Sequence, residues 1–144
     1  MKNISNKSMI CLDLGKKRIG LAGCDPLGIT ITPLPAILRT SFNADIDKLK
    51  DLSIKRNTAG IIFGLPLDEK GHETYQSKHC RKEGLRIARH LVLPFAFVNE
   101  HSSTWEAKNK TNLNNDKTGK LDSLAAAIIL EQWLREGPLL ESTT

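Results

Sequence analysis

The chain has 144 residues, of which 40% are hydrophobic and 26% are charged. This length suits one domain with a full core and excludes two lobes that close on a cleft. No apolar run approaches the roughly 20 residues that cross a bilayer, so we expect a cytoplasmic protein with no membrane partner. The formal net charge of +5 favours a polyanionic partner, nucleic acid before a membrane surface.

The first hairpin carries a carboxylate in an unusual place. Residues 9–14 are an apolar strand interrupted by Asp13, a basic turn follows Gly15, and residues 19–22 form the returning strand. A carboxylate inside an apolar strand is costly to desolvate unless it finds a partner. We consider two interpretations of Asp13: a metal ligand in an active site, or an acid bonded to the backbone amides of its own turn.

The remaining pattern predicts an α/β domain. Asp25-Pro26-Leu27-Gly28 is a turn sequence after the first hairpin. Pro33 and Pro35 interrupt a third strand over residues 29–38, which indicates an edge strand that completes an antiparallel set of three. Continuous apolar runs then alternate with helical periodicity, which is typical of parallel strands covered on both faces. We expect helices over residues 43–56, 73–90 and 121–135, with Ser41 or Asn43 capping the first, and parallel strands over 59–63 and 91–98. The last helix should bury a broad face that carries Leu124, Ala125, Ile128, Ile129 and Trp133.

The chain has no internal repeat or linker, so we assign one domain to residues 9–137. Residues 1–8 are expected to be a flexible N-terminal tail, and residues 138–144 a C-terminal tail. A further helix should begin near Ser103, which forms a capping box with Glu106. Residues 109–120 are polar and without periodicity, which predicts a mobile loop.

Two more acids are expected to point inward near Asp13. Glu100 follows the second parallel strand, at the sheet end where α/β proteins bind ligands, and Asp122 lies on the apolar stripe of the last helix. A structural interpretation remains for each: Glu100 paired with Arg18 or a lysine, and Asp122 as a helix N-terminal acid. Three carboxylates from three elements would repel one another unless Mg²⁺ or Mn²⁺ lay between them.

These features favour metal-assisted cleavage of phosphodiester bonds. The sequence combines the three acids with a basic surface and lacks a phosphate-binding glycine loop. The four histidines lack ligand spacing, and Cys11, Cys24 and Cys80 form no C-x-x-C pair, so neither a zinc site nor a disulfide framework is indicated. No nucleophilic Ser-His-Asp or Cys-His arrangement is evident.

The chain resembles the YqgF (RuvX) family. The segments that carry this resemblance are Leu12-Asp13-Leu14-Gly15-Lys16-Lys17-Arg18-Ile19-Gly20-Leu21-Ala22, Asp25-Pro26-Leu27-Gly28, Pro33-Leu34-Pro35, Gly64-Leu65-Pro66-Leu67 with Gly71, Asn99-Glu100-His101-Ser102-Ser103-Thr104, and Asp122-Ser123-Leu124-Ala125-Ala126-Ala127-Ile128-Ile129-Leu130. The resemblance implies a ribonuclease H-like fold, with a mixed five-stranded sheet of three antiparallel and then two parallel strands between helices. It also implies that Asp13, Glu100 and Asp122 are the catalytic, metal-binding triad.

The same resemblance implies a nuclease, first proposed as a Holliday-junction resolvase and later connected with maturation of the 5′ end of pre-16S ribosomal RNA. We therefore predict cleavage of pre-rRNA, with ribosomal precursor particles as further partners. The alternatives are a resolvase acting on branched DNA and a non-catalytic RNA-binding factor in ribosome assembly. A sugar-kinase or actin-like ATPase begins with a similar hairpin, but this chain is too short for the second lobe of such enzymes. Monomer and homodimer both remain open.

One site motif departs from the family. Asn99-Glu100-His101 stands where the family usually has Asp-Glu-Arg, so a permanent cation is replaced by a titratable ring. We nevertheless expect His101 to bind phosphate. The other predicted nucleic-acid contacts are Lys16, Lys17 and Arg18 at the hairpin tip and Lys117 and Lys120 in the loop, whereas the cluster from Lys78 to Arg89 fits a solvated helix face equally well.

Overall fold

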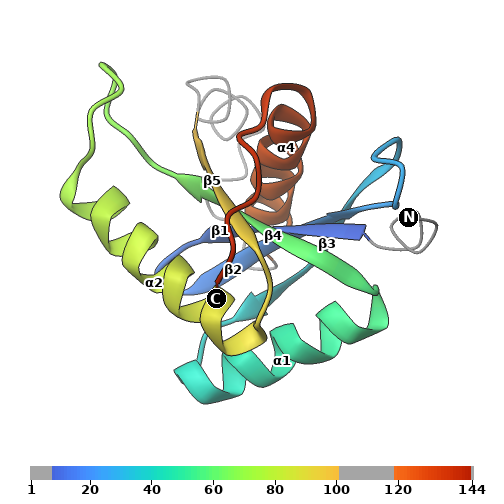
Figure 1. The fold of residues 1–144 in the computed structure, drawn as a ribbon. Coiled ribbons are helices and arrows are strands. Elements are labelled where there is room, and N and C mark those ends of the chain that lie inside the picture. Colours follow the sequence, from blue (N-terminus) through green and yellow to red (C-terminus); the bar gives the residue numbers. More distant parts are fainter. Residues whose placement is uncertain (1–7, 101–118, 144) are drawn as a thin grey trace.

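The computed structural model describes residues 8–100 and 119–143 (Figure 1). The order of its elements is β1 (Ser8–Leu14), β2 (Arg18–Cys24), β3 (Ile31–Leu38), α1 (Phe42–Lys55), β4 (Thr58–Leu65), α2 (Tyr75–Leu91), β5 (Phe95–Asn99) and α4 (Lys120–Glu136). None of the helices in these two ranges is long and apolar enough to cross a bilayer.

The strands form one mixed five-stranded sheet in the order β3-β2-β1-β4-β5. β1 pairs antiparallel with β2, and β2 with β3, whereas β1–β4 and β4–β5 are parallel. This arrangement confirms the predicted fold class. Helices α1 and α2 cover one face of the sheet and α4 covers the other (Figure 1), so the sheet has a core on each side.

Alternation along β1 separates the two cores. Ile10, Leu12 and Leu14 belong to the core beneath α1 and α2, whereas Cys11 belongs to the core beneath α4. Because successive strand residues face opposite sides of a sheet, Asp13 lies on the α4 side with Cys11. The candidate site is therefore on the α4 face.

A capping side chain stabilises the first turn of both α1 and α2. Ser41 caps α1 by accepting a hydrogen bond from Ala44 N at 3.2 Å, which confirms one of the two predicted caps. Thr74 caps α2 and forms a reciprocal capping box with Ser77. These bonds satisfy backbone donors that the first helical turn leaves unpaired.

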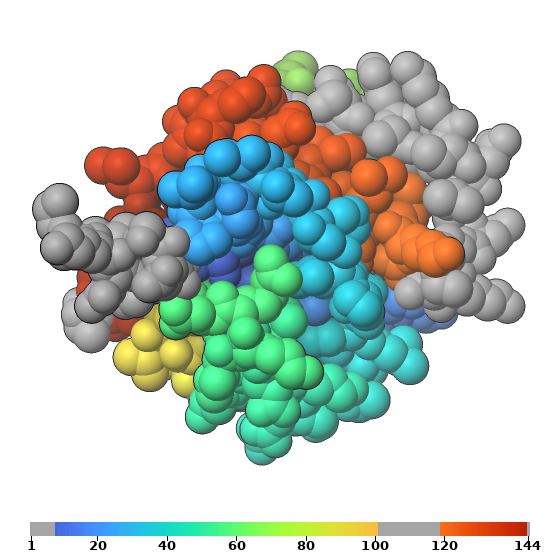
Figure 2. Space-filling model, turned by 90° about the vertical axis from the view of Figure 1, so that its right-hand side faces the viewer, coloured from blue at the N-terminus to red at the C-terminus, as the bar shows by residue number. Residues whose placement is uncertain are grey.

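The β2–β3 turn confirms the one predicted from Asp25-Pro26-Leu27-Gly28. The carboxylate of Asp25 accepts hydrogen bonds from Ile29 N at 2.7 Å and Thr30 N at 2.8 Å, and these and neighbouring amides lower its pKa. In Figure 2 this hairpin, in blue, lies beside α4, in orange and red, and a Cβ on Gly28 would be 3.1 Å from Leu134 Cδ2. The hairpin therefore extends the surface on which α4 packs.

Three local predictions were wrong. Residues 91–93 were expected in a strand, but Leu91 ends α2 and Val92 adopts a left-handed φ of 54° that turns the chain into β5. Lys120 was assigned to a loop and is instead the first residue of α4. Leu124, expected in the core, is 37% exposed. Apolar residues surround much of this helix, so its sequence did not fix which side faces the sheet.

Some predictions fall outside the described residues. They are the helix expected near Ser103, most of the predicted loop over residues 109–120, and the N-terminal tail except Ser8. Beyond α4, the chain returns to the sheet: Glu141 forms an antiparallel bridge with Phe95, with N···O distances of 2.9 and 2.6 Å. This contact covers part of the outer edge of β5.

Candidate active site

Asp13 occupies the centre of the candidate site, near the carboxyl end of β1. Its side chain is partly buried rather than enclosed in the core. Gly20 is its direct partner on β2, and Gly64 lies one residue beyond the Leu12–Phe63 pair on β4. Paired residues in neighbouring strands direct their side chains to the same face. Asp13 is therefore flanked on the α4 face by two residues without side chains.

The first of these glycines positions Asp122. A Cβ built on Gly20 would lie 2.2 Å from the carbonyl oxygen of Asp122 and 2.9 Å from its Cβ. The first turn of α4 can approach β2 this closely only because residue 20 is glycine. The close approach places Asp122 over β2, beside Asp13.

The second glycine makes room for Glu100. A Cβ on Gly64 would lie 3.0 Å from Glu100 Oε1 and 2.6 Å from Ile129 Cδ1. The backbone of Glu100 continues the pairing of β5 with β4 through a hydrogen bond from its N–H to Leu65 O at 2.9 Å. The Glu100 side chain thus lies over β4, on the other side of Asp13 from Asp122, and the three predicted acids share one face of the sheet.

The charge of these acids influences a neighbouring thiol. Cys11, two residues before Asp13 on the same face, is fully buried, and burial is the main reason that its pKa is raised well above the usual value. The carboxylates of Asp13 and Glu100 raise the pKa further, since they oppose formation of a thiolate nearby. The cluster is therefore a region of negative potential.

Ser123 anchors the helix turn that carries Asp122. Its hydroxyl donates to Leu34 O at 2.6 Å and accepts from Leu21 N at 3.2 Å, and the residue is 3% exposed. It therefore joins α4 to both β2 and β3. This role was not predicted from the sequence, although a serine on the inward face of an alanine-rich helix was a usable signal.

The basic residues of the hairpin tip lie on both faces of the sheet. Arg18 Nη1 lies 3.7 Å from Asp122 Oδ2, which brings one predicted phosphate-binding residue to the acids. Lys16 instead lines a cavity on the opposite side of the sheet, and Lys17 is exposed between them. Lys120 is exposed at the start of α4, whereas His101 and Lys117 lie outside the described residues.

The donor chemistry of the three acids suits a divalent cation. Carboxylate oxygens are the ligands preferred by Mg²⁺ and Mn²⁺, and the space above Gly64 that a Cβ would fill holds a carboxylate oxygen of Glu100. Among residues 8–100 and 119–143, no three His, Cys, Asp or Glu side chains are already grouped closely enough to hold a metal ion. The acids share a face, and Arg18 stands beside one of them.

Comparison with solved structures shows the same fold elsewhere. The Thermus thermophilus RuvC protein, solved in complex with a Holliday junction substrate, matches with a TM-score of 0.56 and 13% identity, covering 94% of this chain and 99% of that one. Another structure of Thermus thermophilus RuvC matches with a TM-score of 0.53. At this identity the likeness concerns the fold alone, which is the predicted ribonuclease H-like fold.

Sequence comparison gives much closer relatives. Two proteins from different strains of Prochlorococcus marinus are each 60% identical to this chain and are named "Putative pre-16S rRNA nuclease". The matches cover 93% and 94% of this chain, and 88% and 94% of those proteins. The family model described as "RuvX: Holliday junction resolvase" matches residues 7–136. The chain therefore belongs to the RuvX family.

Proposed function

We propose that this protein is a metal-dependent nuclease that hydrolyses phosphodiester bonds during 5′-end processing of pre-16S rRNA. The observation that carries the proposal is the placement of Asp13, Glu100 and Asp122 on one face of the sheet, with Gly20 and Gly64 making room for them. The names of the 60% identical relatives support the choice of substrate. The work would take place in the cytoplasm, on pre-rRNA or on ribosomal precursor particles.

Each acid has a role in the proposed reaction. Asp13, Glu100 and Asp122 would hold Mg²⁺ or Mn²⁺, and Asp13 occupies the middle position of the three. The bound metal would supply an activated water and stabilise charge on the phosphate and the leaving oxygen. Ser123 holds the turn that carries Asp122, and thereby keeps this carboxylate over β2.

Basic residues would hold the scissile strand. Arg18 is the best placed of them, because it already lies beside Asp122, where a phosphate at the acids would be within its reach. Lys16, Lys17 and Lys120 are exposed around the same sheet end and would bind flanking phosphates. His101 and Lys117 keep the same proposed role from the sequence alone.

A second candidate is cleavage of branched DNA. The description of the matching family model as a Holliday junction resolvase favours it. Metal chemistry directed at the sugar-phosphate backbone does not by itself distinguish RNA from DNA. The two activities therefore have to be separated with substrates rather than with site residues.

The test is cleavage of a 5′-extended pre-16S rRNA fragment and of a four-way DNA junction in parallel, with Mg²⁺, Mn²⁺ or EDTA. We expect metal-dependent cutting of the RNA by the wild-type protein and no cutting by Asp13→Asn. Cutting of the junction alone would replace the proposal with the resolvase. RNA binding that is equal in both proteins, with neither cutting any substrate, would establish a non-catalytic assembly factor instead.

A further inference from the structure

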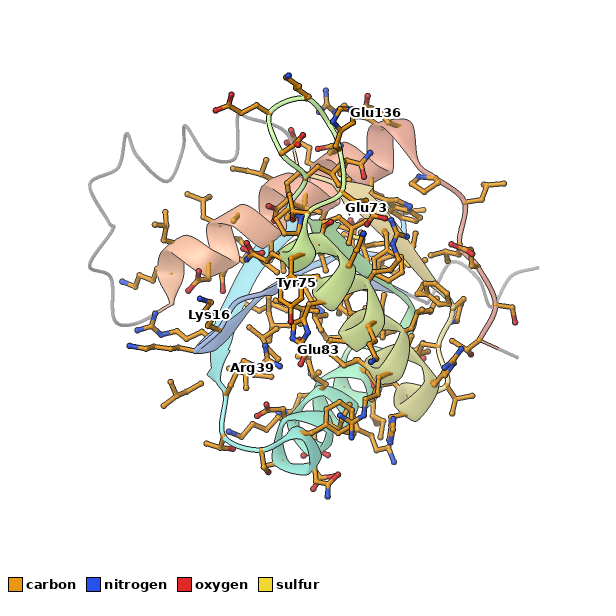
Figure 3. The ribbon with its side chains drawn as sticks, turned by 90° about the vertical axis from the view of Figure 1, so that its left-hand side faces the viewer. Lys16, Arg39, Glu73, Tyr75, Glu83 and Glu136 are labelled. Carbon is orange, nitrogen blue, oxygen red and sulfur yellow. The ribbon has the colours of Figure 1, made fainter. Side chains whose placement is uncertain are left out.

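A cavity of about 670 Å³ lies on the side of the sheet opposite the acids. The end of the β1–β2 hairpin forms one wall, and the segment from Arg39 to Asp45 and the α2 face from Tyr75 to Arg86 form the others. Figure 3 shows Lys16, Arg39, Tyr75 and Glu83 around its opening. A smaller hollow of about 200 Å³, lined by His79, Lys82, Glu83 and Arg86, continues along α2. We call the two together the α2 groove.

One arginine contacts both acids that line the α2 groove. Arg39 pairs with Glu83, lies 3.9 Å from Asp45 Oδ2, and donates to Gly15 O at 2.6 Å. Its guanidinium therefore joins α1, α2 and the hairpin, and its single positive charge offsets one of the two carboxylate charges in the groove. Any ligand in the groove meets the remaining basic groups.

Those groups are Lys16, Lys82, Arg86 and His79. Within the described part of the chain, no ion pair with an acid involves Lys16 or Arg86. Arg86 instead lies over the ring of Phe42, with its guanidinium carbon 3.6 Å from the ring centroid. This contact orients a cation at the groove wall without neutralising it. The groove is therefore suited to anionic groups.

An aromatic side chain stands at the rim. Tyr75, the first residue of α2, is 89% exposed although it lines the cavity. An exposed ring next to cations provides a face on which a base can stack, as in sites for single-stranded nucleic acids. The combination fits a nucleotide better than an inorganic anion, because it offers a stacking surface as well as charge.

The hairpin tip connects the α2 groove with the acids. Arg18 reaches Asp122 on one side of the sheet, whereas Lys16, two residues earlier, lines the groove on the other side. A strand bound at the acids would therefore reach the groove by crossing the Lys16–Arg18 turn. Cations on both sides of this turn would contact its phosphates along that path.

We propose that the α2 groove binds nucleotides of the single-stranded RNA that flanks the scissile phosphate, with a base against Tyr75 and phosphates near Lys16 and Arg86. This inference rests on the proposed function and adds to it a second contact region across the sheet from the acids. It also assigns a role to part of the basic surface of α2, which the sequence left equally compatible with a solvated helix face.

The test measures binding of fluorescently labelled RNA in EDTA, where no cleavage occurs. The probes are a pre-16S rRNA fragment with long single-stranded flanks and shorter fragments trimmed from the 5′ or the 3′ side of the cut. We expect Tyr75→Ala and Arg86→Gln each to weaken binding of the long probe by about fivefold or more, and Tyr75→Phe to restore it. Arg86→Gln should also lower the salt dependence by about 0.7 in log–log slope.

Trimming one flank should remove the effect of both substitutions, because the groove would then be empty. Arg89→Gln is the matched control, since it removes the same charge from an exposed position of α2 that does not line the groove, and it should bind the long probe like the wild type. Cleavage in Mn²⁺ is measured on the same proteins, so that the two proposals can fail separately.

If Tyr75→Ala binds the long RNA as tightly as Arg89→Gln does and still cleaves it, the groove proposal is overturned and the nuclease proposal stands. The groove proposal would also be overturned if adenosine monophosphate displaced the long RNA as well as the oligonucleotide of the removed flank does, because the groove would then be a mononucleotide site. Failure of the wild-type protein to bind any of the RNA probes would overturn both proposals.

Discussion

Gly20 faces Asp13 across the β1–β2 ladder, and the backbone of Asp122 fills the space where a side chain of residue 20 would stand. Two of the three acids are thus brought together by the absence of a side chain. A methyl group at this position would lie 2.2 Å from Asp122 O, and backbone cannot yield as easily as the end of a flexible side chain. Gly20 therefore links the packing of α4 with the geometry of the acids.

Gly20→Ala should consequently lower both stability and activity. We expect a loss of about 1–3 kcal/mol in the free energy of unfolding, measured by denaturant titration, because the first turn of α4 must move away from β2. RNA cleavage should fall as well. Gly60→Ala is the control, because the three atoms nearest to its Cβ would belong to the flexible side chains of Leu140 and Met9 rather than to backbone. Equal stability of the two variants would contradict this account.

Ser123→Ala should also weaken the contact between the first turn of α4 and strands β2 and β3, by removing a hydroxyl rather than by adding a methyl group. The substitution leaves Leu21 N and Leu34 O without their hydroxyl partner in a buried place, which costs about 1–3 kcal/mol. Thermal and denaturant unfolding measure the loss, and reduced cleavage would report displacement of Asp122. Ser53→Ala removes an exposed hydroxyl on α1 and should change stability by no more than about 0.5 kcal/mol. A similar small change for Ser123→Ala would show that the packing of α4 on β2 and β3 does not depend on this hydroxyl.

Arg18→Gln should separate stability from RNA binding. The ion pair with Asp122 is 3.7 Å long and partly exposed, so its loss should cost less than about 1 kcal/mol of unfolding free energy. RNA affinity should fall, and the log–log salt slope should decrease by about 0.7, because one phosphate contact is lost. Arg135→Gln, the same charge change at the far end of α4, is the control. An unchanged salt slope for Arg18→Gln would remove this residue from the RNA-binding surface.

The buried thiols predict a loss of stability at alkaline pH. Burial raises the pKa of Cys80 to about 11, and Glu100, Glu83 and Asp13 add to the effect. The folded protein therefore holds this proton more tightly than the unfolded chain does, so the contribution is complete below about pH 9 and is lost as the pH rises towards 11. Unfolding free energy measured across this range should decline, and Cys80→Ala should decline less steeply.

Thiol labelling provides an independent measurement of the same burial. Cys11, Cys24 and Cys80 are all buried, and burial raises the pKa of each thiol. At pH 8, Cys11 and Cys24 of the folded protein should react with a thiol reagent only when the protein unfolds, and all three cysteines should react at once in guanidinium chloride. Rapid labelling of Cys11 or Cys24 in the folded protein would contradict the burial of that thiol.

The sequence predicted the sheet because its signals were local. The basic turn at residues 16–18 defined a hairpin, and the apolar runs before Gly64 and Asn99 had the composition of strands covered on both faces. The acids could also be selected, because Asp13 interrupts such a run and Glu100 ends another. Strand identity and strand ends were therefore enough to place the candidate site at one end of the sheet.

Local sequence patterns could not predict how distant segments pack against one another. Nothing local indicates that the backbone of Asp122 lies against Gly20 or that Gly64 lies under Glu100, because these contacts join residues far apart in the chain. The orientation of α4 was also missed at Leu124, since a helix that is apolar on most sides has no unique inward stripe. The α2 groove depends on Arg39, whose partners come from three separate elements.

The most direct test of the central claim is the single-turnover cleavage rate of the pre-16S rRNA fragment as a function of Mn²⁺ concentration, for the wild type and for Asp13→Asn, Glu100→Gln and Asp122→Asn. If the three acids hold the metal together, each substitution should lower the rate by about 100-fold or more while RNA binding in EDTA stays within about twofold. A wild-type rate in any one of the three variants would contradict the assignment of that acid, and wild-type rates in all three would refute the site.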